Sequence, residues 1–456
     1  MEEYDVIVIG SGAGMNIVEN AIGHNLKTAL VDKGPLGGTC PNLGCIPSKL
    51  LIASADVVMN IRNSEKFGIK SKIEKIDFPE IMKYMKDYVD HIRENMRKGI
   101  LEDKRIDFYE GECYFVDDYT IKVNNKKIKG KKIFIACGAR PLIPPIKNIE
   151  NIDYLTNESL LDLKEIPKSM VIIGGGYIAS EYAHFFDAMG TEVKIVEMGN
   201  KLVASEEPEI SELLKEEFEK RMKIHLNTKA IEVVKKNGEY CVKCIDTKTK
   251  KEKIVKGEKI LLASGRKPNS DILKVENTGV ETDNNGFIKI NEYFETTKQN
   301  IWAFGDVIGK QMFTHVSRAE ADLVWHNSMH KPKQKFDYSS SPHAVFTYPE
   351  IAAVGLKEQE AKNNHKILVG KAFYKDVSKG AALREKITFA KAIVERDTYK
   401  ILGFHIIGPY ASVLIQEVIN AMAYDGKLNS LAAGMRIHPA MTELIADVFN
   451  NLNTVD

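Results

Sequence analysis

The chain has 456 residues, a length that fits two to four domains, and its 44% hydrophobic and 28% charged content is that of a globular protein. The formal net charge of +1 provides no bulk electrostatic attraction to nucleic acid or to an anionic membrane. The acidic start MEEYDVIVIG lacks a basic region, and no apolar stretch approaches the roughly 20 residues that span a bilayer. We therefore expect no targeting peptide, no membrane span and a cytoplasmic location.

The first element expected from the N-terminus is a nucleotide-binding βαβ unit. The stretch YDVIVIGSGAG predicts a buried strand that enters a glycine-rich turn at Gly10, Gly12 and Gly14. A helical stretch and a second strand follow, and Asp32 closes that strand 22 residues after Gly10. This layout places a pyrophosphate at the helix N-terminus and a carboxylate on a ribose. Met15 stands where the third glycine of the fingerprint belongs, so we expect the helix to lie slightly further from the strand.

Two cysteines in GGTCPNLGCIPSK follow this unit. Cys40 and Cys45 have four residues between them, in a loop rich in Gly and Pro that leads into an apolar helical stretch. Six cysteines are sparse for this length, so the pair indicates redox or metal chemistry rather than a disulfide framework. A helix start lowers the pKa of a thiol, which suits a redox pair. Cys241 and Cys244 lie in the strand-like YCVKCI, where residues three apart point to opposite faces, and we interpret them as structural.

The nucleotide-binding pattern recurs in SMVIIGGGYIASEYAHFFDAMGTEVKIVE. Gly174 and Gly176 form the turn, Ala179 replaces the third glycine, and Glu197 ends the second strand 23 residues after Gly174. Two such units predict two dinucleotides. The acidic Glu197 suits the ribose hydroxyls of NADH and would repel the 2′-phosphate of NADPH, and no arginine follows it in MGNKLVASEE. We therefore favour NAD(H) over NADP.

Two similar stretches, IFIACGARP and ILLASGRKPN, each follow a strand and mark the two ends of the inserted second unit. Beyond them, KQNIWAFGDVIG carries Asp306 at the end of an apolar strand, where parallel sheets bind ligands. Alternating strands and apolar helices then indicate a different architecture. The fold class predicted is α/β: two Rossmann-like three-layer dinucleotide-binding domains plus a C-terminal α+β domain. The predicted segments are 1–145 (first domain), 146–267 (second domain), 268–335 (completion of the first domain) and 336–456 (C-terminal domain).

The last motif is IHPAMTELIADVFNNL. His438 precedes Pro439, and Glu443 follows five residues after the histidine. Because Pro439 opens a helix, the carboxylate can fold back to orient the imidazole, which can take up and return a proton near neutral pH. Taken alone, a His-Pro pair is typical of a surface loop. No spacing of His, Cys or Asp in the chain suggests a metal site.

These motifs resemble those of the FAD-dependent pyridine nucleotide-disulfide oxidoreductases of class I, along essentially the whole chain. GGTCPNLGCIPSK is similar to the family's redox-active disulfide motif, apart from Pro41, where a leucine or valine is usual. WAFGD, ASGRKPN and HPAMTE match further family motifs. The resemblance implies FAD in the first unit, NAD(H) in the second, and a C-terminal dimerisation domain that forms a homodimer with active sites shared across subunits.

The resemblance also implies roles for single residues. Cys45 would be the thiolate against the flavin, Cys40 the exchange thiol, and Lys49 with Glu181 the ion pair beside the flavin. His438, oriented by Glu443, would be the acid–base group contributed by the other subunit. The implied cofactor-binding residues are Gly10, Gly12, Gly14, Asp32, Lys33, Thr39, Lys49, Gly138, Gly174, Gly176, Tyr177, Glu181, Glu197, Gly265, Arg266 and Asp306.

The resemblance implies a small dithiol or disulfide as substrate, and several family branches remain open. The acid at position 197 favours dihydrolipoamide dehydrogenase, acting on a lipoyl group that a partner protein would carry. The stretches SGAGMNIVENA and IASEYAHFFDAMG are closer to the mycothione reductase branch, so another low-molecular-weight disulfide is the alternative. The tail NNLNTVD lacks the cysteine pair of mercuric reductases. A docking subunit, and a transhydrogenase or quinone reductase that would not need Cys40, are further readings.

Overall fold

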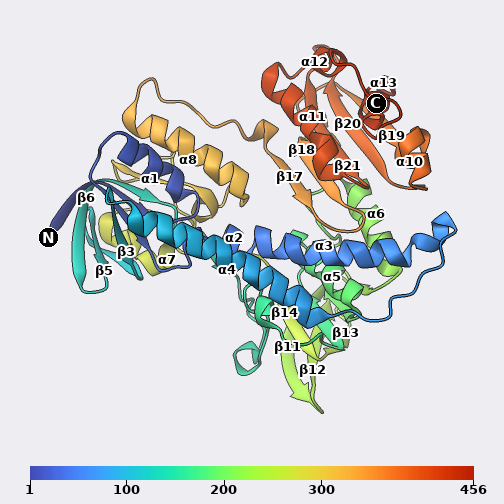
Figure 1. Ribbon diagram of the computed structural model, residues 1–456, viewed down its shortest axis with the longest axis horizontal. Coiled ribbons are helices and arrows are strands. Elements are labelled where there is room, and N and C mark those ends of the chain that lie inside the picture. The colour runs from blue at the N-terminus through green and yellow to red at the C-terminus, as the bar shows by residue number, and fades with distance from the viewer. Residues whose placement is uncertain (456) are drawn as a thin grey trace.

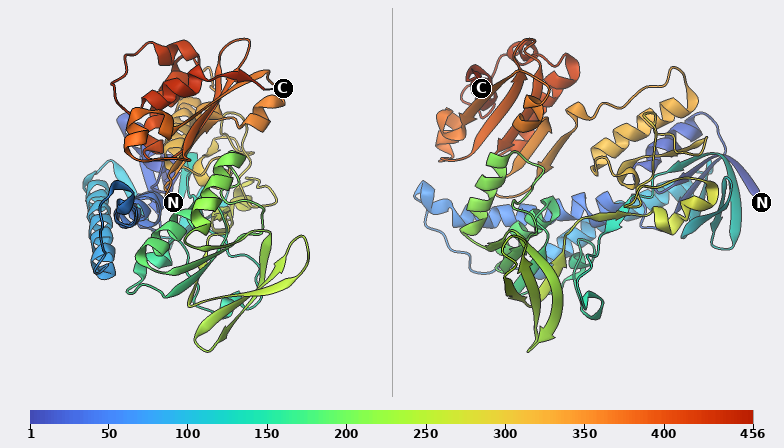
Figure 2. Two further views of the ribbon diagram at one scale, coloured as in Figure 1. Left: turned by 90° about the vertical axis from the view of Figure 1, so that its right-hand side faces the viewer. Right: turned by 180° about the vertical axis from the view of Figure 1, so that it is seen from behind.

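The computed structural model describes residues 1–455. The molecule has three units, each built on its own main sheet. Figures 1 and 2 show them from three sides. The N-terminal unit lies at one end, the C-terminal unit at the upper right of Figure 1, and a second nucleotide-binding unit below it. The long helices α3 (Cys45–Arg62) and α4 (Phe78–Glu102) connect the first unit to the second.

The first unit is built on a seven-stranded sheet of order β3-β2-β1-β6-β5-β4, in which β16 pairs with the second half of β6. β1, β2, β3, β6 and β16 run parallel, and β4 and β5 are antiparallel additions. Helices α1 (Gly14–Gly23) and α8 (Thr314–Met329) pack with β1 in one apolar core, which explains why β1 reads as a continuous apolar run. The strands are β1 (Glu2–Ile9), β2 (Thr28–Asp32), β3 (Ile106–Glu110), β4 (Cys113–Asp117), β5 (Thr120–Val123), β6 (Lys126–Ile135) and β16 (Ile301–Ala303).

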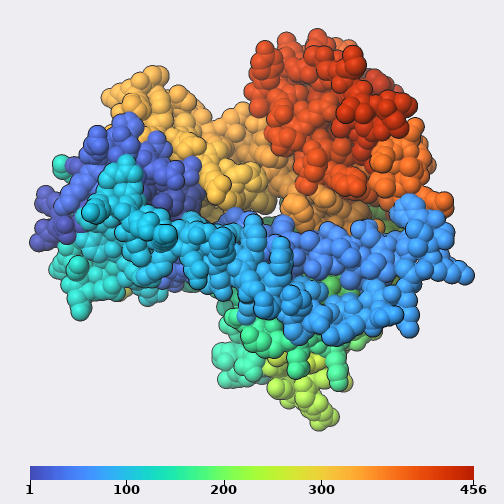
Figure 3. All heavy atoms as spheres, in the orientation of Figure 1, coloured from blue at the N-terminus to red at the C-terminus, as the bar shows by residue number. Residues whose placement is uncertain are grey.

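The helical segment after β2 begins with the short α2 (Thr39–Leu43) and continues as α3. By length and composition alone, Thr39–Arg62 is apolar enough to cross a membrane, so the expectation that no stretch approaches this length is wrong. Its apolar side packs into a core shared with α4 and with α5 (Tyr177–Met189) of the second unit. At the start of α4, the Asp77 side chain accepts the N–H of Glu80 and caps the helix. In Figure 3, α3 and α4 form the blue band across the middle of the molecule, with the C-terminal unit above and the second unit below.

The second unit contains a four-stranded parallel sheet of order β10-β9-β8-β14, flanked by α5 and α6 (Pro208–Glu219) and by an antiparallel three-stranded sheet. The chain enters through β7 (Ala139–Pro141) and leaves through β15 (Arg266–Pro268), and these two strands pair with each other. The short helix α7 (Ser270–Leu273) follows. The remaining strands are β8 (Ser169–Ile173), β9 (Glu192–Val196), β10 (Lys223–His225), β11 (Thr228–Lys236), β12 (Glu239–Asp246), β13 (Glu252–Gly257) and β14 (Lys259–Leu262).

The C-terminal unit is a six-stranded antiparallel sheet of order β17-β18-β21-β20-β19-β22, with α11 and α13 packed in its core. A buried lysine joins it to the second unit: Lys391 contacts Glu207, Glu209 and Glu358 at 3.1, 3.1 and 2.7 Å. The strands are β17 (Pro342–Val345), β18 (Ile351–Gly355), β19 (Ile367–Phe373), β20 (Phe389–Glu395), β21 (Ile401–Ile407) and β22 (Asn453–Thr454). The helices are α9 (Glu358–Lys362), α10 (Ser378–Ala382), α11 (Ala411–Tyr424), α12 (Leu428–Ala432) and α13 (Glu443–Asn450).

The predicted fold class is confirmed: the protein has two parallel α/β dinucleotide-binding units and a C-terminal α+β unit. Both glycine-rich turns connect the first strand of a unit to its first helix. Cys241 and Cys244 lie on β12, and both are buried. The exact segment boundaries stay predictions.

Candidate active site

The two cysteines of the candidate redox pair lie where α2 meets α3. Cys40 is the second residue of α2, Gly44 separates the helices, and Cys45 is the first residue of α3. The loop before them packs on the first glycine-rich turn, since a Cβ on Gly38 would lie 3.0 Å from the Cα of Gly12. Glycine is needed at position 38 for a second reason, its φ of +69°. The cysteine loop is therefore fixed, backbone against backbone, to the turn that opens α1.

The two thiols differ in acidity. The hydrogen bond from Cys40, then Thr314 and the charge of Lys49, lower the pKa of Cys45 to about 6, against the effect of burial. The Oγ1 atom of Thr314 lies 3.6 Å from the Cys45 Sγ. The same contact with Cys45, together with burial, raises the pKa of Cys40. With both thiols reduced at neutral pH, Cys45 is the thiolate and Cys40 keeps its proton.

An ion pair lies one helical turn beyond Cys45. The Lys49 Nζ is 2.9 and 2.8 Å from the two carboxylate oxygens of Glu181, which joins α3 to α5. The carboxylate is buried and also accepts the backbone N–H of Phe346 at 3.0 Å, and the lysine lies over the Phe346 ring. Three interactions therefore hold this pair in place, so the charge of Lys49, which lowers the pKa of Cys45, and the charge of Glu181, which opposes that effect, are both fixed near the thiol.

An aromatic side chain stands at the start of α5. Tyr177 is its first residue, and its ring lies 5.9 Å from the ring of Phe313, centroid to centroid. Burial raises the pKa of Tyr177 to about 12, so the phenol stays neutral. Glu181, one turn on, reaches Lys49 from the same helix. Helix α5 thus carries both Tyr177, a predicted cofactor-binding residue, and Glu181 of the predicted ion pair.

The first glycine-rich turn requires glycine at two of the three predicted positions. A Cβ on Gly10 would lie 2.3 Å from the carbonyl oxygen of Ala136, and one on Gly14 would lie 2.9 Å from Val8 Cγ1. Gly14 therefore provides the close helix–strand approach expected of the third glycine, and Met15 packs against the core of this unit. The Cβ of a residue at position 12 would meet nothing nearer than 3.9 Å, which leaves the turn open toward a ligand.

The carboxylate of Asp32 is tied to this turn. Its Oδ2 accepts the N–H and the hydroxyl of Ser11, both at 2.6 Å, and its Oδ1 accepts the N–H of Gly34 at 2.7 Å. The hydroxyl of Ser11 also accepts the N–H of Gly37, in the cysteine loop. Asp32 is thus held at the end of β2, beside the glycine-rich turn, where the predicted role in ribose binding places it.

The second glycine-rich turn has the same construction. A Cβ on Gly174 would lie 2.2 Å from the carbonyl oxygen of Ala263, whereas position 176 faces open space. The Glu197 side chain lies across the turn, 2.8 Å from where a Cβ on Gly175 would stand, and accepts the N–H of Gly199. A carboxylate is therefore fixed at the rim of the predicted NAD(H) site.

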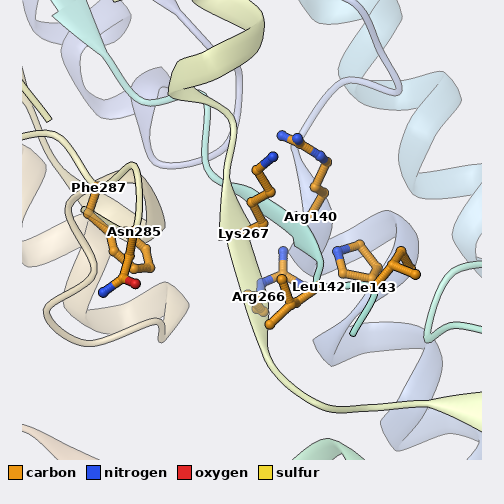
Figure 4. A pocket seen from close by; sticks show the side chains of 8 residues that line it. Arg140, Leu142, Ile143, Arg266, Lys267, Asn285 and Phe287 are labelled. Carbon is orange, nitrogen blue, oxygen red and sulfur yellow. The ribbon is translucent and has the colours of Figure 1, made fainter. Parts of the chain in front are cut away.

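The residues near β7 and β15 form a pocket of about 520 Å³, seen in Figure 4. Arg140, Arg266 and Lys267 line it, and neither cysteine does. The Arg266 Nε is buried, has no hydrogen-bond partner among residues 1–455, and lies 3.4 Å from an oxygen of Asp306. Burial raises the pKa of Asp306, and the arginine beside it opposes that effect.

These residues fit the two dinucleotides that the sequence predicts. A half-buried carboxylate beside a guanidinium whose Nε has no hydrogen-bond partner among residues 1–455 suits the hydroxyls and phosphates of a flavin side chain. Asp306 and Arg266, with the first glycine-rich turn and Asp32, would hold FAD. Glu197 and the second turn would hold a pyridine nucleotide.

Four other predicted cofactor residues have surroundings of their own. Thr39 opens α2, where a Cβ on Gly44 would press against it. Gly138 and Gly265 both have positive φ, of +66° and +123°, next to the paired strands β7 and β15. Lys33 is exposed and pairs with Glu112 on the surface, so the structure gives it no contact with the site.

The predicted acid–base pair forms within the C-terminal unit. The His438 Nδ1 lies 2.7 Å from Glu443 Oε1, and the other oxygen of Glu443 accepts the N–H of Ala440 at 3.0 Å. The histidine side chain is 72% exposed. Helix α13, which begins at Glu443, and helix α2 lie in different parts of the chain, as Figure 1 shows. One chain therefore holds the dyad and the cysteines apart.

Three contacts of the site could not be read from the sequence. Thr314 reaches Cys45 from the start of α8, and the backbone of Phe346 binds Glu181 from the end of β17. Glu320 on α8 is buried and accepts the N–H of Gly305 at 2.7 Å, beside Asp306, and burial raises its pKa to about 7. The sequence offers no signal for which residue of α8 faces the cysteines.

Comparison with known families and proteins agrees with this geometry. Residues 4–321 match the pyridine nucleotide-disulphide oxidoreductase family, and residues 341–448 match the dimerisation domain of the same family. Curated relatives include a mercuric reductase of Staphylococcus aureus (32% identical, 97% of this chain, 81% of that one). A dihydrolipoyl dehydrogenase of Chlamydia pneumoniae is 33% identical (98% and 96%), and the mycothione reductase of Mycobacterium tuberculosis H37Rv is 31% identical (99% and 100%).

Solved structures agree as well. The HOCl-induced flavoprotein disulfide reductase RclA from Escherichia coli superposes with a TM-score of 0.87 at 26% identity, over 98% of this chain and 99% of that one. Its Cu(II) complex gives a TM-score of 0.88. Family models cover most of the chain, and the cysteine pair, ion pair and two nucleotide turns are all present. The chain is therefore a member of the FAD-dependent pyridine nucleotide-disulfide oxidoreductase family, class I.

Proposed function

We propose that this protein is an NAD-linked disulfide oxidoreductase that moves an electron pair between NAD(H) and a small dithiol or disulfide, with dihydrolipoamide as the leading substrate. The observation that carries the proposal is the asymmetric cysteine pair, in which Cys45 is acidic and Cys40 is not. FAD, when bound, supplies the two-electron transfer between nicotinamide and the thiol pair.

The cysteines divide the exchange reaction between them. In the reductive direction, the Cys40 sulfur attacks the substrate disulfide, forms a bond to one substrate sulfur and releases the other as a thiolate, which takes a proton. Cys45 then attacks the Cys40 sulfur, releases the second substrate thiolate and closes the Cys40–Cys45 disulfide. The substrate gains two electrons and two protons, and the cysteine pair loses two electrons, which NADH replaces. Oxidation of dihydrolipoamide runs through the same steps in reverse.

The His438–Glu443 dyad of a second copy would move the protons. Cys40 has a raised pKa, so it needs a base before it can attack. The contact of Nδ1 with Glu443 leaves Nε2 facing outward as the working nitrogen. Because the dyad and the cysteines lie apart in one chain, a homodimer is required, and the family's dimerisation domain supports it.

The carboxylate of Glu197 supports NADH as the partner nucleotide. It stands at the rim of the second turn, where it would accept the two hydroxyls of the adenosine ribose and repel a 2′-phosphate. The same acid supports a dihydrolipoamide dehydrogenase assignment. Identities of 31–33% to relatives with three different names do not choose among substrates, so another small disulfide remains the second candidate.

The test is anaerobic turnover of the FAD-loaded dimer with NADH or NADPH against lipoamide and glutathione disulfide. We expect NADH to support rapid lipoamide reduction, and Cys40→Ser to lose disulfide turnover while keeping NADH-dependent ferricyanide reduction. Cys244→Ser, at a buried thiol on β12, is the matched control and should keep both activities. Full disulfide turnover by Cys40→Ser would contradict the proposed role of Cys40. A wild-type protein that reduces no disulfide, together with full NADH turnover by Cys40→Ser, would favour a transhydrogenase or quinone reductase.

A further inference from the structure

A cation lies in the neighbourhood of the exchange cysteine. Helix α8 begins at Thr314, whose hydroxyl contacts Cys45, and Arg318 follows four residues later, on the same face of the helix. Side chains of a helix lean toward its N-terminus, which directs this guanidinium toward the cysteines. The neighbouring Cys45 and burial raise the pKa of Cys40, whereas Thr314 and the charge of Arg318 lower it. Arg318 is thus near enough to act on the Cys40 sulfur.

This arginine differs from the other ten in the sequence. Arg318 is exposed, and the described part of the chain, residues 1–455, offers it no ion pair and no hydrogen bond. Asp322, one turn further along α8, instead accepts the side-chain amide of Asn16 at 3.1 Å. Arg384 lies over the ring of Phe67. The arginines with a carboxylate partner are Arg62, Arg93, Arg97, Arg105, Arg140, Arg221, Arg266, Arg396 and Arg436.

We propose that Arg318 is a specificity-determining residue that selects disulfides carrying a carboxylate or another anionic group within reach of its guanidinium. The inference rests on the proposed function, because it requires Cys40 to be the thiol that meets the substrate, and it favours the second substrate candidate, a free small disulfide, over an amide-linked lipoyl group. A guanidinium binds a carboxylate through two parallel hydrogen bonds, and an exposed arginine without a partner has both free. A neutral amide in the same place offers no charge to pair.

Lipoate and lipoamide test this selection directly. Both contain the same cyclic disulfide, but lipoate ends in a carboxylate and lipoamide in a neutral amide. We expect the wild-type protein to favour lipoate over lipoamide in kcat/KM, and the ratio to fall about tenfold in Arg318→Gln. Raising the ionic strength should lower the wild-type ratio as well. Arg318→Glu should reverse the preference toward cystamine, a cationic disulfide.

The control is Arg396→Gln, at an exposed arginine between β20 and β21 that pairs with Asp397. It should leave the lipoate-to-lipoamide ratio unchanged. A second readout needs no turnover: the reduced protein should react faster with anionic dithiobis(nitrobenzoate) than with neutral dithiodipyridine, and Arg318→Gln should remove the difference. Flavin absorbance and the thermal midpoint check that each variant is folded.

The outcomes separate the two proposals. Reduction of both lipoyl compounds with a ratio unaltered in Arg318→Gln would overturn the role of Arg318 and leave the disulfide oxidoreductase standing. A wild-type protein that reduces no disulfide in the panel would overturn the proposed function and this inference with it. If the lipoate-to-lipoamide ratio falls in Arg318→Gln while disulfide turnover is retained, the result would establish selection for an anionic substrate. It would also favour a free small disulfide over an amide-linked lipoyl group.

Discussion

Thr314 shows how one hydroxyl can set the chemistry of a sulfur atom. It is the first residue of α8, and its Oγ1 lies 3.6 Å from the Cys45 Sγ. Because a hydroxyl can donate to a thiolate, it stabilises the charged form of Cys45 and lowers its pKa together with Cys40 and Lys49. Thr314 is therefore a positioning and tuning residue for the thiolate.

Thr314→Val should raise the pKa of Cys45 from about 6 by about one pH unit, because valine keeps the shape and removes the donor. The measurement is the rate of iodoacetamide alkylation of the reduced protein between pH 5 and pH 9, with Cys40→Ser as background. Thr297→Val, on an exposed threonine that bonds the Gly279 carbonyl, is the control and should leave the profile unaltered. An unshifted profile in Thr314→Val would show that the hydroxyl does not donate to the sulfur.

The sequence predicted the functional residues that lie within motifs. It missed the residues that contact these motifs from distant parts of the chain. The acid–base dyad was predictable because Glu443 follows His438 by five residues, and the structure brings them to 2.7 Å. Thr314 was not, because its contact with Cys45 spans 269 residues and depends on where α8 starts. The expectation that Met15 would move the helix away from the strand is wrong, because Gly14 makes the close approach instead.

Helices α3 and α5 carry most of the site between them. Besides the Lys49–Glu181 pair, the His184 Nε2 lies 3.0 Å from an oxygen of Asp56 on α3, and Arg221 lies 3.3 Å from the other ring nitrogen. The α3–α5 crossing is thus buttressed by polar pairs along its length. Apolar periodicity predicted both helices, but it could not show which of their polar side chains face each other.

The His184 pair makes the α3–α5 crossing sensitive to acid. Burial lowers the pKa of His184, so the folded protein binds a proton there less readily than the unfolded chain. The stabilising contribution is present above the unfolded pKa of about 6.5 and is lost as the pH falls through the lower folded pKa. The free energy of unfolding should therefore fall, by at most about 1.4 kcal/mol per pH unit from this group, as the pH drops below 6.5.

Urea unfolding of wild type and His184→Gln at pH 5, 6 and 7 measures this effect. The variant should be less stable at pH 7 but should lose less stability on acidification. His91→Gln, at an exposed histidine of α4 bonded to Asn95, should follow the wild type. Equal pH slopes in His184→Gln and wild type would assign the acid sensitivity to other groups.

At the scale of the molecule, the C-terminal unit exposes several large apolar side chains. Five of them lie at the N-cap of α11, on α11 and in the segment before α13: Tyr410, Val413, Tyr424, Met435 and Ile437. Ile437 directly precedes the exposed His438 in the chain. Exposed apolar side chains in the unit that carries the acid–base residue fit a subunit interface that would deliver His438 to the cysteines of a second copy.

Val413→Glu should therefore shift the protein from dimer to monomer and abolish disulfide turnover, because a charge would be buried at the interface. It should keep ferricyanide reduction by NADH, which needs a single chain. Sedimentation and paired assays test both results. Ile254→Glu, on an exposed residue of β13 in the second unit, should remain a fully active dimer. A monomer with full disulfide turnover would show that the dyad acts within one chain.

The pairing of β7 with β15 has a consequence for how such a protein can change over evolution. Arg266 lies opposite Pro141, so the chain leaves the first unit and returns to it on neighbouring strands, roughly 4.8 Å apart. A turn of two to five residues bridges that gap. The whole nucleotide cassette between them can in principle be excised or exchanged through a single graft point, with the flavin half of the molecule left closed. A donor cassette must also supply the carboxylate of Glu181, which holds Lys49 beside Cys45, so coenzyme preference can be exchanged there only if this contact with the thiol site is kept.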